Sequence, residues 1–118
     1  MFNIKKEFQF DAAHQLMGLP PTHPCTRLHG HTYTVIIELE SPVLRDPGFI
    51  SDYRDLAEIK NWLDKEFDHR NLNDVIPLNP TAELIAMFIY ERWKPDYPEL
   101  KAVSVKETPK TIATYYEG

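Results

Sequence analysis

Two segments in which apolar and polar residues alternate constrain the fold of this chain more than any other feature. In residues 2–14 the even positions are mostly apolar and end with His14, while most odd positions are polar. In residues 29–40 the odd positions begin with two histidines and continue as apolar residues. Because successive side chains of a β-strand point to opposite faces, each segment predicts a strand with one buried face.

The rest of the chain predicts two helices followed by two short strands. Asp52 can cap a helix whose apolar stripe ends at Phe67, and Asn79 or Thr81 can cap a second helix that stops before Pro95. The patterns also predict strands over 102–108 and 111–116, and loops rich in proline or asparagine over 15–28 and 68–80.

The element order is therefore ββααββ, in a single domain over residues 1–118. Strands grouped at both ends, with helices between them, favour an α+β fold in which both helices cover one face of an antiparallel sheet. A four-stranded sheet leaves two open edges, and pairing between subunits is one way to cover them. We therefore expect a homo-oligomer.

Composition narrows the class of function. The net charge is −5, with acidic and basic residues interspersed, which argues against a nucleic-acid-coating protein. The single cysteine cannot form an internal disulfide, no segment approaches the ~20 apolar residues of a membrane span, and the N-terminus lacks the apolar run of a signal peptide. We expect a cytoplasmic protein that acts on a small molecule, without nucleic-acid or membrane partners.

Three histidines form the candidate metal site. If the two N-terminal strands pair antiparallel, His14 ends one strand where His29 and His31 begin the other, and all three rings face inward. Three neutral imidazoles with an open fourth position are typical of a catalytic Zn²⁺ site. An isolated histidine is usually structural, but His-x-His opposite a third histidine favours a metal. Zinc is preferred over copper or iron because of the ligand types.

Cys25 lies four residues before His29, in a polar loop that contains prolines. Such a loop is a poor place for a buried apolar filler, the usual role of an intracellular cysteine. Two interpretations remain, a fourth metal ligand in a closed site or a reactive thiolate, and the spacing does not separate them. His23, in the same loop, has no predicted orientation and stays unassigned.

Three further acidic or imidazole side chains are candidates. Asp68-His69 follows the first predicted helix, as an ordinary helix end or as an imidazole that carries protons beside an orienting carboxylate. Glu107 lies on the inward side of its predicted strand, and a buried carboxylate needs a partner, either a cation or the N–H edge of a guanine-like ring. Thr81 and Glu83 are better explained by capping and by the helix dipole.

Together these motifs resemble the 6-pyruvoyl-tetrahydropterin synthase family over nearly the whole chain. Six segments carry the resemblance, in order along the chain: 10–14, 25–31, 50–56, 67–73, 79–83 and 105–108. The resemblance implies the tunnelling fold, in which ββααββ subunits assemble into oligomeric barrels with active sites at the subunit interfaces.

The resemblance also implies a role for each candidate residue. It implies zinc binding by His14, His29 and His31, catalytic proton transfer by Cys25, Asp68 and His69, and binding of the pterin ring by Glu107. Thr26 stands where relatives often have glycine, and Tyr53 where they often have phenylalanine.

The three residues between Cys25 and His29 resemble the 6-carboxy-tetrahydropterin synthase branch of queuosine and 7-deazaguanine biosynthesis. This branch implies a carbon–carbon lyase that converts 7,8-dihydroneopterin triphosphate to 6-carboxy-tetrahydropterin, acetaldehyde and triphosphate, with Arg27 as the candidate to steer the triphosphate. The alternatives are a 6-pyruvoyl-tetrahydropterin synthase, which is a phosphorus–oxygen lyase that stops after triphosphate elimination, and a non-catalytic zinc- or pterin-binding module. A further branch, with glutamate at the cysteine position, acts on dihydroneopterin, and Cys25 argues against it.

Overall fold

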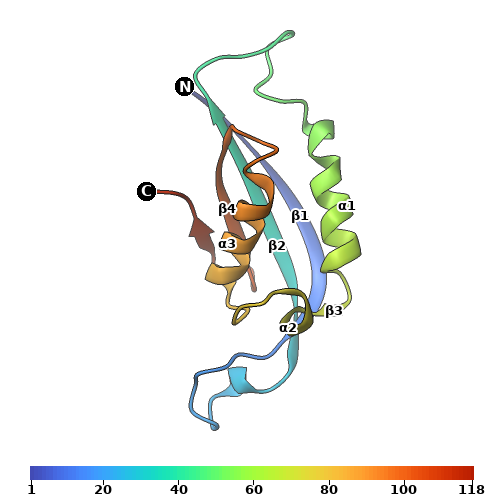
Figure 1. Ribbon diagram of the computed structural model, residues 1–118, viewed down its shortest axis with the longest axis vertical. Coiled ribbons are helices and arrows are strands. Elements are labelled where there is room, and N and C mark those ends of the chain that lie inside the picture. The colour runs from blue at the N-terminus through green and yellow to red at the C-terminus, as the bar shows by residue number, and fades with distance from the viewer.

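A five-stranded sheet carries the helices on one face in the computed structural model, which describes all 118 residues (Figure 1). Its two long strands are β1 (Phe2–His14) and β2 (His29–Ser41), which pair antiparallel over their whole length. The strand order is β3-β1-β2-β4-β5, completed by β3 (Arg70–Asn71), β4 (Leu100–Lys106) and β5 (Ala113–Tyr115). The helices are η1 (Pro24–Thr26), η2 (Tyr53–Leu56), α1 (Ala57–Glu66), α2 (Leu72–Val75) and α3 (Ala82–Trp93).

The alternation in the two long strands separates a buried from an exposed face, as predicted. On β2, residues Tyr33 to Leu39 at odd positions are fully buried, and on β1 burial begins at Phe8 and continues at even positions to His14. These side chains join apolar residues of α1, α3 and β4 in one core. Each fully buried large apolar side chain stabilises the fold by roughly 1.5–3 kcal/mol, so the inward face is fixed by packing.

Side-chain caps begin the main helices near the predicted positions. Asp52 accepts a hydrogen bond from the Arg54 N–H at 2.9 Å and starts η2, which leads into α1. Of the two candidate caps for the second helix, Thr81 is the one used, because its hydroxyl accepts from the N–H of Leu84 at 3.2 Å. The tunnelling-fold order ββααββ is therefore confirmed for the six main elements.

The segment 68–80 differs from the predicted loop. It contains β3 and the single turn α2, and β3 pairs parallel to Ala12 and Ala13 of β1, so the sheet is mixed rather than wholly antiparallel. A strand of two residues and a helix of four are too short to produce a period in the sequence. The strand predicted over 102–108 corresponds to β4, which ends earlier, at Lys106. Glu107 therefore lies one residue beyond the strand.

Both edges of the sheet remain open in the single chain. Only Ala12 and Ala13 of β1 pair with β3, so the edge of β1 from Phe2 to Phe10 has no neighbouring strand, and β5 forms the opposite edge. Exposed apolar side chains lie near these edges, among them Phe2 and Tyr116. The sheet of one chain is therefore not closed into a barrel.

None of the helices is long and apolar enough to cross a membrane.

Candidate active site

Three histidine side chains converge on the inward face at the end of the β1–β2 ladder. The register pairs His14 with His29 and Ala12 with His31, so the three rings lie side by side on one face. One ring nitrogen from each histidine lies within 4.8 Å of the other two. His14 is 1% exposed and the other two are half-buried. The sequence places these residues correctly because both strands keep their alternation to the last residue.

The hydrogen bonds of the cluster fit a metal ion. Nδ1 of His14 lies 2.8 Å from the carbonyl of Pro80, and Nδ1 of His29 lies 2.7 Å from the carbonyl of Arg27. A carbonyl only accepts, so each Nδ1 carries the proton and, in a neutral ring, leaves the Nε2 lone pair free. The two Nε2 atoms are 2.9 Å apart. Two lone pairs at this distance repel unless a cation lies between them, and tetrahedral zinc ligands would sit roughly 3.3 Å apart.

Burial keeps the cluster in its metal-binding form. Desolvation lowers the pKa of His14 and of His31, while the nearby charge of Glu107 opposes this shift. Tyr33 lies beneath the rings, with its centroid 5.8 Å from that of His14 and 5.5 Å from that of His31. It also stacks on Phe10 at 5.1 Å. Burial among packed rings therefore favours the neutral form of His14 and His31. The neutral imidazole is the form that binds a metal.

Glu107 lies on the same side of the sheet as the histidines. The last β2–β4 pair is Thr34 with Lys106, and one further step along the two strands sets Glu107 opposite Tyr33. The negative charge of Glu107 acts in the direction of a higher pKa for His14 and so opposes the lowering caused by burial. With Leu16 and residues 81–83 at the start of α3, Glu107 lines a cavity of about 360 Å³. A carboxylate, a helix N-terminus and an adjacent metal-binding cluster can together hold a polar ring.

Cys25 is half-buried on η1 and is not part of the metal-binding cluster. Its N–H donates to Nδ1 of His23 at 3.1 Å, and its carbonyl accepts from the N–H of Leu16 at 2.9 Å. His23, unassigned in the sequence, therefore caps η1. Thr26 fastens the same turn through its hydroxyl, which donates to the His23 carbonyl at 2.7 Å.

Two asparagines that sequence reasoning did not select hold the start of the loop over 15–28. The Asn73 side chain accepts from the Gln15 N–H and donates to the Gln15 carbonyl, both at 2.8 Å. Asn79 forms the same pair of bonds with Met17, at 2.9 and 3.0 Å. Asparagine is common in any turn, so only the folded chain distinguishes these two.

Asp68 and His69 form a hydrogen-bonded ion pair, with Oδ2 of Asp68 2.9 Å from Nδ1 of His69. The bond and charge of Asp68 raise the pKa of His69. The N–H of Asp11, followed by the bond to His69, lowers the pKa of Asp68. The imidazole side chain is 79% exposed, and the backbone of His69 has a φ of 57°. The pair therefore favours a charged imidazole in contact with solvent.

The Asp68–His69 pair does not join the histidine cluster within one chain. His69 lines a hollow of about 630 Å³ together with His31 of the cluster and with the strand residues Asp11 and Thr32. These two strand residues alternate with the inward-facing ones and so belong to the outward face of the sheet. The candidate residues of a single chain are thus divided between the two faces.

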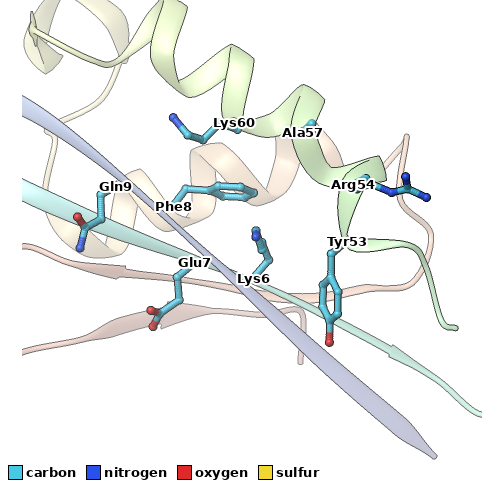
Figure 2. A pocket seen from close by; sticks show the side chains of 8 residues that line it. All are labelled: Lys6, Glu7, Phe8, Gln9, Tyr53, Arg54, Ala57 and Lys60. Atoms are coloured by element: carbon cyan, nitrogen blue, oxygen red, sulfur yellow. The ribbon is translucent and has the colours of Figure 1, made fainter.

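The largest groove lies elsewhere, beside the open edge of β1. Residues 6–9 of β1 form one wall, and Tyr53, Arg54, Ala57 and Lys60 of η2 and α1 form the other (Figure 2). Its volume is about 680 Å³, and none of the seven candidate residues lines it. It is therefore a feature of the sheet edge and not of the candidate site.

Comparison with known proteins gives a consistent result. The family model described as 6-pyruvoyl tetrahydropterin synthase matches residues 3–118. The chain is 36% identical over 125 residues to a 6-carboxy-5,6,7,8-tetrahydropterin synthase of Synechocystis, which covers 98% of this chain and 94% of the relative. It is also 36% identical over 101 residues to a dihydroneopterin monophosphate aldolase of Pyrococcus furiosus, which covers 83% and 82%.

A solved structure agrees with the fold. The 6-pyruvoyl tetrahydropterin synthase of Caenorhabditis elegans superposes with a TM-score of 0.87 at 26% identity, over 99% of this chain and 96% of that one. The order of elements, the sequence relatives and the family model point to the same group. The chain therefore belongs to the 6-pyruvoyl tetrahydropterin synthase family of enzymes.

Proposed function

We propose that this protein is a zinc-dependent 6-carboxy-5,6,7,8-tetrahydropterin synthase that cleaves the side chain of 7,8-dihydroneopterin triphosphate and releases acetaldehyde and triphosphate. The observation that carries the proposal is the cluster of three histidines, together with the cavity that Glu107 lines. The relative from Synechocystis supports the choice of reaction. Such a product fits the queuosine and 7-deazaguanine pathway.

The inward face binds the substrate. His14, His29 and His31 would hold Zn²⁺, which would supply Lewis-acid chemistry to oxygen atoms of the substrate side chain. Glu107 accepts hydrogen bonds from the N–H and NH₂ edge of the pterin in the adjoining cavity. Because the carboxylate has no cation within bonding distance in the chain, it is available to these donors.

Proton transfer falls to the residues outside the metal-binding cluster. Cys25, as a thiolate, removes a proton from the substrate, and His69 returns one as an imidazolium that Asp68 orients. The position of Cys25 outside the histidine cluster favours this role over that of a fourth ligand. Exposure of His69 gives it access to a substrate that another chain binds.

We infer that the complete site uses a second copy of the chain, because His69 lies outside the histidine cluster within one chain. Residues Phe2–Phe10 of β1 and the outer edge of β5 present unpaired backbone groups, which a second copy can pair. The groove in Figure 2 opens along the same β1 edge. We therefore propose a homo-oligomer with interfacial active sites.

Mixing of two inactive variants tests the interfacial site. Cys25→Ala and His69→Ala subunits are each expected to lack activity, whereas oligomers reassembled from both contain some interfaces with an intact Cys25 and an intact His69. Recovered activity, up to about a quarter of the wild-type value for random mixing at two-subunit sites, supports the arrangement. If both residues act from one chain, mixing restores nothing.

Product analysis tests the reaction. Incubation with 7,8-dihydroneopterin triphosphate, followed by mass spectrometry and a zinc assay on the same sample, should give 6-carboxy-tetrahydropterin and acetaldehyde. A 6-pyruvoyl product without acetaldehyde would identify the alternative synthase. Absence of turnover in a zinc-loaded oligomer would favour a binding module.

The aldolase of Pyrococcus furiosus provides a second candidate, activity on dihydroneopterin monophosphate, because that relative is as similar to this chain over its matched length. The two candidates differ in the phosphate chain of the substrate. Parallel assays with the monophosphate and the triphosphate separate them. A higher kcat/KM for the monophosphate would replace the proposed reaction with the aldolase reaction.

A further inference from the structure

Asp11 contacts both members of the Asp68–His69 pair through its backbone N–H and carbonyl. Its backbone N–H donates to Oδ1 of Asp68 at 2.9 Å, and its backbone carbonyl accepts from the N–H of His69 at 2.6 Å. Neither bond uses the Asp11 side chain. The backbone of a single residue of β1 thus fixes the position of both residues, and its carboxylate remains free for other interactions.

The Asp11 carboxylate is held by the residue directly opposite on β2. The Thr32 hydroxyl donates to Oδ1 of Asp11, and the two residues are register partners. Both line the hollow that His69 also lines. A second carboxylate, in addition to that of Asp68, is therefore held beside the exposed imidazole.

The backbone of His69 needs this support. Its φ of 57° lies in the left-handed region, which residues other than glycine adopt uncommonly, although asparagine, aspartate and histidine do so more often than the rest. Such conformations persist where the surroundings fix them, and they cluster at functional sites. The bond from its N–H to the Asp11 carbonyl is one such constraint.

The charges around His69 favour its protonated form. Asp68 has the largest effect on the pKa of His69, and Asp11 raises this pKa further. The opposing cation in the hollow is Arg70, whose guanidinium instead donates to the carbonyl of Lys65 at 3.2 Å. The charge of Lys60, on α1, contributes to the lowered pKa of Asp68.

His31, the other titratable group that lines the hollow, belongs to the inward cluster, where burial lowers its pKa. It therefore contributes no positive charge near neutral pH. The carboxylates of Asp68 and Asp11 thus face the imidazole, and neither forms an ion pair with a lysine or arginine.

We propose that Asp11 is a positioning residue of the Asp68–His69 pair: its backbone N–H and carbonyl fix the two residues, and its carboxylate, held by Thr32, stabilises the protonated imidazole of His69. This inference rests on the proposed function, in which His69 donates a proton. It assigns the Asp11–Thr32 pair on the outward face to the support of proton transfer, although neither residue is a candidate metal ligand.

Titration of His69 by NMR tests the proposal without any turnover. Asp11→Asn keeps the peptide group and an acceptor for Thr32 but removes the charge, and we expect the pKa of His69 to fall by roughly half a unit. Thr32→Val should give a smaller fall, and Thr32→Ser should restore the wild-type value. Glu91→Gln, which removes an exposed carboxylate on α3, is the control for net charge.

The pH dependence of kcat/KM gives the second readout. Because the proposed donor is imidazolium, activity falls as the pH rises through the pKa of His69, and this limb should move to lower pH by the same amount in Asp11→Asn. A His69 titration in Asp11→Asn that matches Glu91→Gln overturns the proposal. The NMR result stands even if the enzyme has no activity on the pterin, so failure of the proposed reaction is distinguishable. Thermal unfolding of each variant verifies that it is folded.

Discussion

The two faces of the β1–β2 ribbon carry histidines in opposite states. On the inward face, desolvation lowers the pKa of His14 and His31 and leaves neutral imidazoles with free lone pairs. On the outward face, the Asp68 carboxylate raises the pKa of the exposed His69. The environment on each face thus suits a histidine to a different role, as a metal ligand on the inward face and as a proton carrier on the outward face.

This comparison also explains why one chain holds two incomplete sites. In β1 and β2 the inward side chains are packed in the core, and the helices cover this face of the sheet (Figure 1). The Asp68–His69 pair remains exposed on the other face, where a neighbouring subunit can reach it. Each prediction below alters one face and asks whether the other responds.

The largest effect is expected from loss of a histidine of the cluster. His31→Ala should lower zinc content by more than about tenfold and abolish turnover, since even outer-shell changes cost 10–100-fold in metal affinity. Measurement of bound metal by mass spectrometry checks this. The control is His23→Ala, because His23 caps η1 outside the cluster and its loss should leave zinc bound. Full zinc occupancy in His31→Ala would remove His31 from the site.

Cys25→Ala should separate catalysis from metal binding. We expect kcat to fall by roughly 10²–10⁴-fold, the usual contribution of a positioned acid or base, with zinc content unchanged. Parallel assays of turnover and metal content give the answer. If zinc is lost together with activity, Cys25 is a ligand, and the thiol belongs to the metal site of the inward face.

Much of the inward face could be predicted from the sequence. The alternation runs without interruption from Phe8 to His14 and from His29 to Leu39, so the antiparallel register and the meeting of the three histidines follow from local pattern. The same rule predicts that Glu107 faces inward, and in the structure, where β4 ends one residue before it, Glu107 lines a cavity with residues 81–83. A period of two residues carries this information wherever the strand is long enough.

The outward face could not be predicted, because it depends on contacts between distant segments. The position of Asp68 follows from the parallel pairing of β3 with β1, and that strand has only two residues. The loop anchors Asn73 and Asn79 likewise bind backbone groups 58 and 62 residues earlier in the chain. A local sequence period carries no information about such contacts. The sequence alone therefore does not distinguish whether Asp68-His69 is an ordinary helix end or a proton-carrying pair.

A smaller effect, confined to the outward face, is expected from Asp68→Asn. A raised pKa means that His69 stabilises the fold fully below its unfolded pKa, and that this contribution is lost as pH rises through the folded value. The variant should weaken this dependence and lower kcat near neutral pH by about tenfold or more. Chemical unfolding and kcat measured across pH 5–9 check both effects.

Asp64→Asn is the matched control, because Asp64 is an exposed carboxylate on α1 that pairs with Lys60 rather than with a histidine. It should leave the pH dependence of kcat unchanged. An equal response in Asp64→Asn would show that net charge, and not the bond between Asp68 and His69, determines the effect.

The smallest effect, on the inward face, is expected at Tyr33. Its hydroxyl is buried without a hydrogen-bond partner, while its ring packs on Phe10 and against His14 and His31. Tyr33→Phe keeps the ring and removes an unpaired polar group, so the free energy of unfolding should stay unchanged or rise by about 1 kcal/mol. Zinc content should be unaffected, since the ring alone supports the histidines. A loss of stability above about 1 kcal/mol in urea unfolding would mean that the hydroxyl has a partner in the assembled protein, and the inward face would then depend on the neighbouring subunit as the outward face does.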